Sequence, residues 1–337
     1  MSRIRHLTYA ESGVDIQAEN RSIAAMKAIL PSKRIGFGAP MTEIGHYAGL
    51  LDMKDFALAM TTDGVGSKVL IANFLKKWDT VGVDCIAMNV NDLLSIGAEP
   101  IAFVDYLAVE KVDLEFAEQI AIGLRRGAEI SNIAIIGGET ASLPDLIKGF
   151  DLAGTAIGIV DKDKVITGAN IKLGDAIVGV PSSGLHSNGY TLARKIIAES
   201  KYTYFDCMPE SIKIIGEELL TPTRIYMEIL DLVKKINVHG LAHITGSGLL
   251  KLQRVTNLGF EIDDPLEPPP IFHFLQDLGN VEETEMYRTF NMGMGFAVIV
   301  PEEDAHEAYQ IMGPGSKVVG SIVKEGLRAG KLELNLI

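Results

Sequence analysis

The segment FDLAGTAIGIVDKDKVITGANIKLGDAIVGVP, residues 150–181, decides how this chain is organised. Its apolar beginning predicts a strand over 150–161, and its apolar end predicts another strand from residue 176 that runs into a turn. The stretch between them, 161–175, mixes charges with glycine and has no strong periodicity. We therefore expect a domain boundary there, with an N-terminal domain over residues 1–165 and a C-terminal domain over residues 166–337.

Apolar periodicity predicts further elements on both sides of this boundary. In the N-terminal part we expect strands over 56–63, 101–109 and 133–140, and helices over 67–78, 82–97 and 114–131. The strand over 133–140 is wholly apolar before its glycines, which favours the centre of a buried sheet. In the C-terminal part we expect helices over 188–200, 223–236 and 249–258, and strands over 241–245, 294–301 and 316–323. This alternation predicts an α/β class with α+β mixed sheets in two domains.

Composition excludes several classes of protein. The chain has 31 Lys plus Arg against 44 Asp plus Glu, so its formal charge is −13, which argues against a nucleic-acid partner. Two cysteines give neither a disulfide framework nor a cysteine-built zinc site. Because no apolar run reaches the roughly 18 residues of a membrane span, we expect no membrane partner and a cytoplasmic location. Phosphorylated metabolites are anions too, so their binding here needs an explanation.

The motif TTDGVGSK, residues 61–68, stands at the expected end of a strand and before a helix. Gly64 and Gly66 would let the backbone approach a phosphate, and the start of a helix offers free N–H groups. Asp63 could hold Mg²⁺ that bridges phosphates, and Lys68 could reach one of them. A plain strand–helix turn explains the same residues. The spacing matches neither a Walker A loop nor a dinucleotide fingerprint.

Two further segments carry acids. In the helix expected over 82–97, Asp84, Met88, Asn91 and Asp92 share one face, which suits oxygen ligands for a hard cation or, alternatively, an ordinary solvated surface. Gly138 lies in a turn that presents Glu139 at the carboxyl end of a strand, where ligands of α/β sheets often bind. Asp63, Asp92 and Glu139 together predict a magnesium cluster, which would let an acidic protein bind anionic phosphates.

Three loops in the C-terminal part could hold an anionic substrate. The segment PSSGLHSNGY, 181–190, contains His186, Ser187 and Asn188 before a helix, and AHITGSGLL, 242–250, repeats the arrangement with His243, Thr245 and Gly246. The segment MYRTFNMGMGF, 286–296, contributes Arg288 and Asn291, of which Arg288 could bind a phosphate or a carboxylate. Capping turns and a surface ion pair are the simpler explanations of these residues.

In combination, these motifs resemble phosphoribosylformylglycinamidine cyclo-ligase, the aminoimidazole ribonucleotide synthetase family of purine biosynthesis. The matching segments include YAESGVDIQAEN, TTDGVGSK, VGVDCIAMNVNDLLSIGAEP, IIGGETA, SSGLHSNGY, HITGSG and NVEETEMYRTFNMGMG, and they occur in the expected order from residue 9 to about 295. The resemblance implies ATP-dependent cyclisation of formylglycinamidine ribonucleotide with Mg²⁺. It also implies a homodimer in which two N-terminal domains form a β-barrel.

The resemblance carries residue roles as well. By position, Asp63, Asp92 and Glu139 match the acidic metal and nucleotide region, Lys27 and residues 64–66 match the ATP region, and His186, Asn188 and His243 match polar active-site positions. We expect Asp92 to be catalytic and either His186 or His243 to move a proton. The chain departs from the family at Ile35, Ser142 and Ser247, where a glycine, an acidic residue and a glycine are frequent.

Two other functions remain open at this point. One is another ATP-using enzyme of the same superfamily, such as thiamine-phosphate kinase or selenophosphate synthetase. The other is a regulatory protein that binds ATP without catalysis, against which the three intact acids argue. The segments HSNGY and MYRTFN favour the cyclo-ligase.

Overall fold

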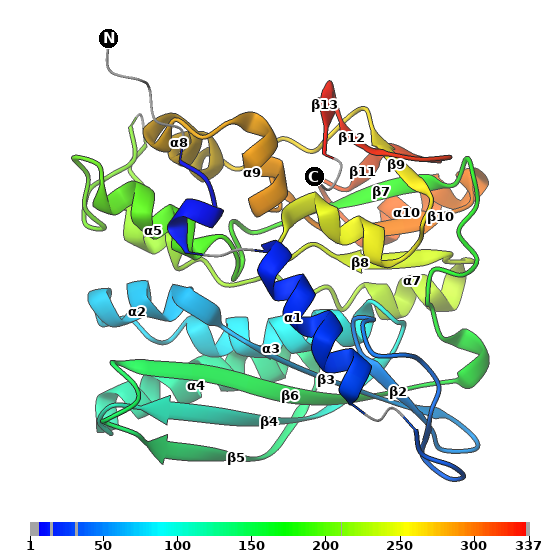
Figure 1. Ribbon diagram of the computed structural model, residues 1–337, viewed down its shortest axis with the longest axis horizontal. Coiled ribbons are helices and arrows are strands. Elements are labelled where there is room, and N and C mark those ends of the chain that lie inside the picture. The colour runs from blue at the N-terminus through cyan, green and yellow to red at the C-terminus, as the bar shows by residue number, and fades with distance from the viewer. Residues whose placement is uncertain (1–6, 14–15, 31–32, 210, 335–337) are drawn as a thin grey trace.

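Two open sheets carry the fold of the computed structural model, which describes residues 7–13, 16–30, 33–209 and 211–334 (Figure 1). The first sheet has the strand order β1-β2-β3-β6-β4-β5 and the second the order β13-β12-β9-β11-β7-β10-β8. All neighbours are antiparallel except the pairs β4–β5 and β9–β12. We call the parts of the chain that hold them the N-terminal and the C-terminal half.

The elements of the N-terminal half alternate between strands and helices. Its strands are β1 (Ala39–Pro40), β2 (Gly49–Asp52), β3 (Ala57–Gly64), β4 (Glu99–Val109), β5 (Ala134–Ser142) and β6 (Phe150–Val160). Its helices are α1 (Ile16–Ile29), α2 (Val69–Leu75), α3 (Val81–Leu94) and α4 (Leu114–Ser131), with short 3₁₀ turns at Ala10–Ser12, Gly66–Lys68 and Lys162–Lys164. The strand predicted over 150–161 and the helix predicted over 114–131 are confirmed as β6 and α4.

The C-terminal half surrounds its sheet with shorter helices. The strands are β7 (Ala176–Pro181), β8 (Gly240–His243), β9 (Gly259–Ile262), β10 (Met294–Val300), β11 (Lys317–Val323), β12 (Leu327–Ala329) and β13 (Leu332–Glu333). The helices are α5 (Tyr190–Ala198), α6 (Ile215–Leu219), α7 (Ile229–Lys235), α8 (Pro270–Gly279), α9 (Glu283–Thr289) and α10 (Ala305–Met312), with 3₁₀ turns at Gly248–Arg254 and Glu302–Asp304. Two predicted helices are therefore wrong in part: 223–236 is helical only from Ile229, and 249–258 is a 3₁₀ turn.

Helix α3 lies between the first sheet and the C-terminal half (Figure 1). All of its residues except Asp92 are buried, as expected for a helix that is apolar on most of its surface. It approaches α4 closely because Gly82 faces Gly123: a Cβ added at Gly82 would lie 2.3 Å from the backbone nitrogen of Leu124. The alternative of a solvated polar face on this helix is thereby excluded.

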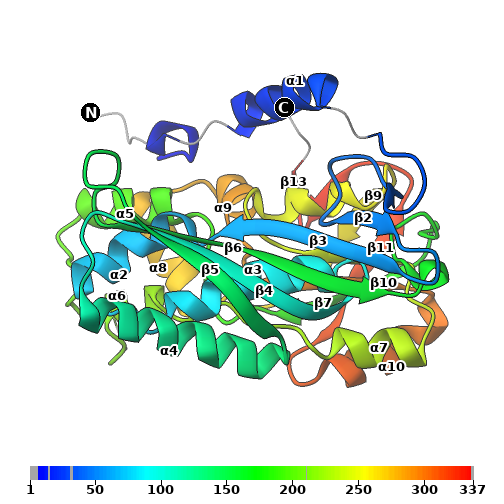
Figure 2. The ribbon, with the colours of Figure 1, turned by 90° about the horizontal axis from the view of Figure 1, so that it is seen from below.

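The opposite face of the first sheet is open in the single chain (Figure 2). Apolar side chains on it are exposed, among them Met60, Val104, Tyr106 and Ile159. Strand β5 is an edge strand with almost all of its residues exposed, so the prediction of a buried sheet centre over 133–140 is wrong for one chain. No part of the chain that the structure describes covers these apolar side chains.

Helix α1 lies apart from both sheets (Figures 1 and 2), and its side chains from Arg21 onward are exposed. In the described ranges, no helix combines the length and the apolar character that crossing a membrane requires.

Candidate functional site

The loops singled out in the sequence meet where α3 and the strand ends of the N-terminal half contact the C-terminal half. Gly66, at a φ of 71°, lies so close to the 182–188 loop that an added Cβ would be 3.7 Å from the carbonyl oxygen of Ser187. One residue on, the hydroxyl of Ser67 lies 3.2 Å from that of Thr191. The predicted phosphate loop and one predicted substrate loop are therefore neighbours.

Lys68 does not present its ammonium group to a ligand, which corrects its predicted phosphate contact. Its side chain is fully buried. Nζ donates to Oδ1 of Asp84 at 2.9 Å, to the carbonyl of His186 at 3.0 Å and to that of Thr221 at 2.7 Å. An ammonium group has three donors, and all three are used here. Burial lowers the pKa of Lys68, and the charge of Asp84 opposes this shift.

The polar face of α3 is an interface between the two halves. Oδ1 of Asp84 accepts hydrogen bonds from the backbone N–H and the hydroxyl of Thr223, at 2.8 and 2.6 Å. Asn91 donates to the carbonyl of Arg224 at 2.9 Å and accepts from the N–H of Tyr226 at 3.1 Å. Both groups of the Asn91 amide are engaged in these bonds, so Asn91 joins the two halves and is not an oxygen ligand for a cation here.

Asp63 and Asp92 form the acidic part of the site. Asp63 ends β3 and accepts a hydrogen bond from the N–H of Gly64 at 2.7 Å. Burial, and then the negative charge of Asp92, raise the pKa of Asp63 to about 6. Oδ1 of Asp92 lies 3.0 Å from Nδ1 of His243, which donates to it. Two carboxylates that destabilise each other's charge in this way form a place where a cation would be favoured.

Glu139 is not brought to these two acids. It pairs with Tyr106 in the β4–β5 ladder and so lies on the open face of the first sheet, whereas Asp63 belongs to the face that covers α3. Within the described ranges, no group of three or more His, Cys, Asp or Glu residues is arranged to hold a metal ion. The predicted three-acid cluster is therefore not assembled by one chain.

The structure explains Gly138 and reveals an acid that the sequence analysis missed. A Cβ at Gly138 would lie 2.3 Å from Oδ1 of Asp105, so any other residue there would displace the Asp105 side chain. Asp105 pairs with Gly154, as Asp63 does from the other side, which places both acids on the same face of the sheet. Burial raises the pKa of Asp105. A single acid within the apolar run IAFVDYLAV was the signal that could have identified it.

Both candidate histidines are buried in the single chain. Nε2 of His186 accepts from the N–H of Ser183 at 3.2 Å, and burial holds its pKa well below the usual range. His243 is fully buried and stacks on Phe296 at a centroid distance of 6.1 Å. His243 orients Asp92 through its Nδ1 contact with Oδ1, and the assignment of the proton transfer to His186 or His243 stays a prediction.

The predicted substrate residues divide into two groups. Asn188 has a buried amide nitrogen without a hydrogen-bond partner in the part of the chain that the structure describes, and its Oδ1 would be 2.9 Å from a Cβ at Gly246. Asn291, by contrast, donates to the carbonyl of Gly184 at 2.9 Å and accepts from the N–H of Gly293. Asn291 therefore shapes the 182–188 loop, which corrects its predicted contact with substrate.

The remaining substrate residues are placed as follows. Ser187 is buried, with its hydroxyl 3.3 Å from that of Thr223, and Thr245 is buried at the end of β8. Arg288 lies in the last turn of α9 and is half-buried.

Lys27 belongs to the outer part of the molecule. It lies in the last turn of α1, and its Nζ would be 2.4 Å from a Cβ at Gly45. Next to Gly45, Ile44 lines a cavity of about 610 Å³ on the open face of the first sheet, with Leu58 and Met60 among its walls. Glu139 is on the side of the sheet away from Asp63, whereas Lys27 lies next to the segment that precedes β2.

Of the departures from the family pattern, Ser247 is the most informative. It adopts the left-handed conformation, with a φ of 74°, that favours glycine. Ile35 is 98% exposed, and Ser142 ends the exposed strand β5. The loop therefore keeps the backbone shape that glycine would give it, but Ser247 is strained in this conformation.

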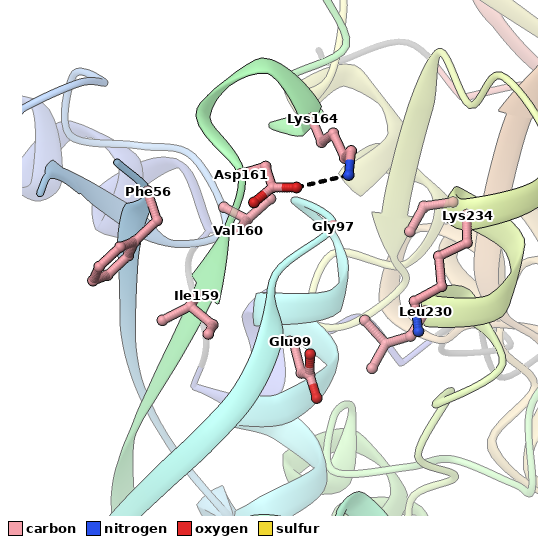
Figure 3. Close-up of a pocket in the computed structure, with 10 residues that line it drawn as sticks. Phe56, Gly97, Glu99, Ile159, Val160, Asp161, Lys164, Leu230 and Lys234 are labelled. Atoms are coloured by element: carbon pink, nitrogen blue, oxygen red, sulfur yellow. Dashed lines mark hydrogen bonds and ion pairs between the residues drawn. The ribbon is translucent and has the colours of Figure 1, made fainter. Parts of the chain in front are cut away.

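A separate cavity of about 310 Å³ opens beyond the end of α3, between the two halves (Figure 3). Its walls combine apolar residues with charged ones, including Glu99 and Lys234, and one ion pair joins Lys164 to Asp161 at 2.6 Å. None of the predicted site residues lines it, so it is distinct from the site around Asp63 and Asp92.

Comparison with known proteins identifies the family. Models of the AIR synthase related protein match the chain with their N-terminal domain over residues 45–160 and their C-terminal domain over residues 172–331. The phosphoribosylformylglycinamidine cyclo-ligase of Methanosarcina barkeri is 64% identical over 329 residues, which cover 97% of this chain and 98% of that protein. That of Pyrococcus horikoshii is 51% identical and covers 95% and 96% of the two chains.

Solved structures share the fold at much lower identity. AaThiL complexed with AMPPCP and TMP has a TM-score of 0.66 at 18% identity, covering 94% of this chain and 96% of that one. PurL of T. maritima complexed with ADP has a TM-score of 0.58 at 19% identity and covers 88% and 45%. Family models match both halves, and a relative that is 64% identical matches almost the whole chain. Together these matches assign the chain to one family. The chain belongs to the phosphoribosylformylglycinamidine cyclo-ligase family.

Proposed function

We propose that the chain catalyses the ATP-dependent cyclisation of formylglycinamidine ribonucleotide to 5-aminoimidazole ribonucleotide, with release of ADP and phosphate, in de novo purine biosynthesis. The observation that carries this proposal is 64% identity to a cyclo-ligase over almost the whole of both chains. The related structures with bound AMPPCP or ADP support ATP as the second substrate. We place the reaction in the cytoplasm, in a chain of two domains, 1–165 and 166–337.

The chemistry follows from the poor leaving ability of an amide oxygen. Transfer of the γ-phosphoryl group of ATP to the formyl oxygen makes the formyl carbon electrophilic and converts the oxygen into departing phosphate. The amidine nitrogen of the same molecule then attacks that carbon and closes the five-membered ring. Well-oriented intramolecular attack has an effective molarity of about 10⁵ M or more. The protein therefore has to orient its two substrates and neutralise phosphoryl charge.

Asp63 and Asp92 fit a magnesium site. Mg²⁺ is commonly held by one or two carboxylates together with substrate phosphates and water, so two acids are a sufficient protein contribution. Burial, and then the charge of Asp92, raise the pKa of Asp63, and a cation would relieve both effects. When bound, Mg²⁺ would neutralise charge on the phosphates. His243 holds Oδ1 of Asp92, as residues behind a metal ligand commonly do.

The loops beside these acids supply the substrate contacts in this proposal. Gly64 and Gly66 leave the backbone next to Asp63 open to a phosphate. The buried amide nitrogen of Asn188 and the neighbouring Gly246 lie across from them in the C-terminal half. We assign the nucleotide to the loop with Gly64 and Gly66. We assign the sugar phosphate of formylglycinamidine ribonucleotide to Asn188 and Gly246.

A homodimer completes the proposal. The exposed apolar residues on the open face of the first sheet, together with the edge strand β5, form a surface that one chain leaves uncovered. Exposed edges and apolar patches of this kind are normally covered by a partner. Two such sheets facing each other would make the dimeric β-barrel that the family resemblance implies, and would bring a second copy to the side that carries Glu139.

One assay tests the proposed reaction. Purified protein is incubated with ATP, Mg²⁺ and formylglycinamidine ribonucleotide, and ADP and the aminoimidazole product are measured. We expect both products in equal amounts, and neither when the ribonucleotide is omitted. ADP release with thiamine phosphate instead would indicate a different enzyme of the superfamily. ATP binding without ADP release on any of these substrates would indicate a regulatory protein.

A further inference from the structure

A buried ion pair joins the two halves of the molecule next to the candidate site. Lys68, at the end of the phosphate loop, and Asp84, on α3, both belong to the N-terminal half, and both side chains are fully buried. The further side-chain hydrogen bonds of this pair run to the C-terminal half. Lys68 donates to the carbonyls of His186 and Thr221, and Asp84 accepts from the N–H and hydroxyl of Thr223.

These bonds act directly on the loop that carries Asn188. The carbonyl bound by Lys68 belongs to His186, whose φ of 62° is unusual for a residue other than glycine. Ser187 follows it, and the carbonyl oxygen of Ser187 faces Gly66. The hydroxyl of Ser187 also lies 3.3 Å from that of Thr223. The ion pair thus sets the distance between the 63–66 loop and the 182–188 loop.

Stability alone is a weak reason for such a pair. Removing two charges from water costs about as much as their attraction returns, and apolar replacements of buried pairs are often neutral. A charged, hydrogen-bonded pair fixes one geometry more strictly than apolar packing does. Here that geometry relates the 63–66 loop, assigned to the nucleotide, to the 182–188 loop, assigned to the ribonucleotide.

We propose that Lys68, Asp84 and Thr223 form an interdomain clamp of positioning residues that holds the 182–188 loop in register with the 63–66 loop for the cyclisation. The inference rests on the proposed function, because the two loops matter together only if two substrates meet between them. None of the three residues is expected to touch a substrate, since all three are buried.

Thr223 provides the cleanest test, because its hydroxyl can be removed without leaving a charge unpaired. Thr223→Val should lower kcat/KM for formylglycinamidine ribonucleotide by about tenfold or more, since small displacements of reacting groups are costly. Thr223→Ser, which keeps the hydroxyl, should stay within about twofold of the wild type. Rescue by serine separates the hydrogen bond from a general packing defect. All variants are assayed at a temperature at which circular dichroism shows them fully folded.

The chain contains a matched control for this change. Thr203 donates its N–H and hydroxyl to one oxygen of Asp206, at 2.6 and 2.8 Å, in an exposed loop of the C-terminal half. Thr203→Val removes the same kind of bond far from the clamp and should leave kcat/KM unchanged. Equal losses in Thr203→Val and Thr223→Val would overturn the proposal.

A double variant separates positioning from stability. Lys68→Met combined with Asp84→Leu replaces the ion pair with apolar side chains, which we expect the core to accept. The clamp predicts a folded protein whose kcat/KM is lower by about tenfold or more, because the carbonyls of His186 and Thr221 lose their donor. A folded double variant with wild-type turnover would contradict it. If the double variant does not fold, the comparison of valine and serine at position 223 still decides.

Hydrogen–deuterium exchange distinguishes failure of the clamp from failure of the proposed function. Amides over 182–188 should exchange faster in Thr223→Val than in Thr223→Ser, whatever reaction the protein catalyses. A wild-type protein without cyclo-ligase activity would refute the proposed function, and the exchange comparison would then test the clamp alone. Unchanged exchange in Thr223→Val would refute the clamp.

Discussion

Asp92 is the residue on which the candidate cation site depends most. Asp92→Asn keeps the shape of the side chain and an oxygen for His243, but removes the charge that would bind Mg²⁺. We expect kcat to fall by about 100-fold or more, because charge stabilisation of this kind typically contributes that much. The melting temperature should change little, since Asp92 is partly exposed. Asp231→Asn, on the exposed side of α7, is the control. Turnover within about twofold of the wild type would remove Asp92 from the site.

Ser247 gives a prediction about stability. Its φ of 74° places Cβ close to the following carbonyl, at a cost of about 1–2 kcal/mol for a residue other than glycine. Ser247→Gly should therefore raise the free energy of unfolding by about 0.5–1 kcal/mol, after the greater freedom of glycine in the unfolded chain is subtracted. Urea denaturation measures this difference. Ser247→Ala retains the strained Cβ and should bring no gain; a gain with alanine alone would show that the backbone is not strained.

At the scale of elements, the sequence predicted local structure better than contacts. Helical periodicity correctly placed Asp84, Asn91 and Asp92 on one face of α3, yet it could not show that this face meets the 221–226 segment. That segment also explains why the helix predicted from residue 223 begins only at Ile229: its backbone groups are engaged by Asp84, Asn91 and Lys68. Non-local hydrogen bonds leave no periodic signal in the sequence, so this part of the site was not predictable.

The crossing of α3 and α4 depends on glycine. Since a Cβ at Gly82 would overlap backbone atoms of α4, Gly82→Ala must separate the two helices. We expect the free energy of unfolding to fall by about 1–3 kcal/mol, the usual cost of overpacking, as measured by urea denaturation. Glu118→Ala, on the exposed side of α4, should be nearly neutral. If Gly82→Ala is as stable as this control, the close approach of the two helices is not tight.

At the scale of the whole molecule, the apolar run over 133–140 was taken for a buried sheet centre and is an exposed edge in one chain. Apolar character predicts that a strand will be covered, but it does not say whether its own chain or another copy covers it. The separation of Glu139 from Asp63 has the same origin, because the two acids lie on opposite faces of one sheet. The sequence predicted Glu139 and Asp63 in one site of one chain. In the proposed dimer, the face with Asp63 packs on α3 and the face with Glu139 packs on the second copy.

Substitution on the open face of the first sheet tests this dimer. Val104 and Tyr106 share the open face of β4 and are 36% and 45% exposed, so Val104→Lys combined with Tyr106→Lys would place two charges in the proposed interface. Buried unpaired charges are costly, so the variant should sediment as a monomer at concentrations at which the wild type has twice the mass of one chain. Leu173→Lys, at an apolar residue 60% exposed outside this sheet, should not change the mass. A double variant that remains dimeric would exclude this face as the interface. If the dimer completes the site from the side of Glu139, the monomeric variant should also lose ATP-dependent turnover while its circular dichroism spectrum stays that of the wild type.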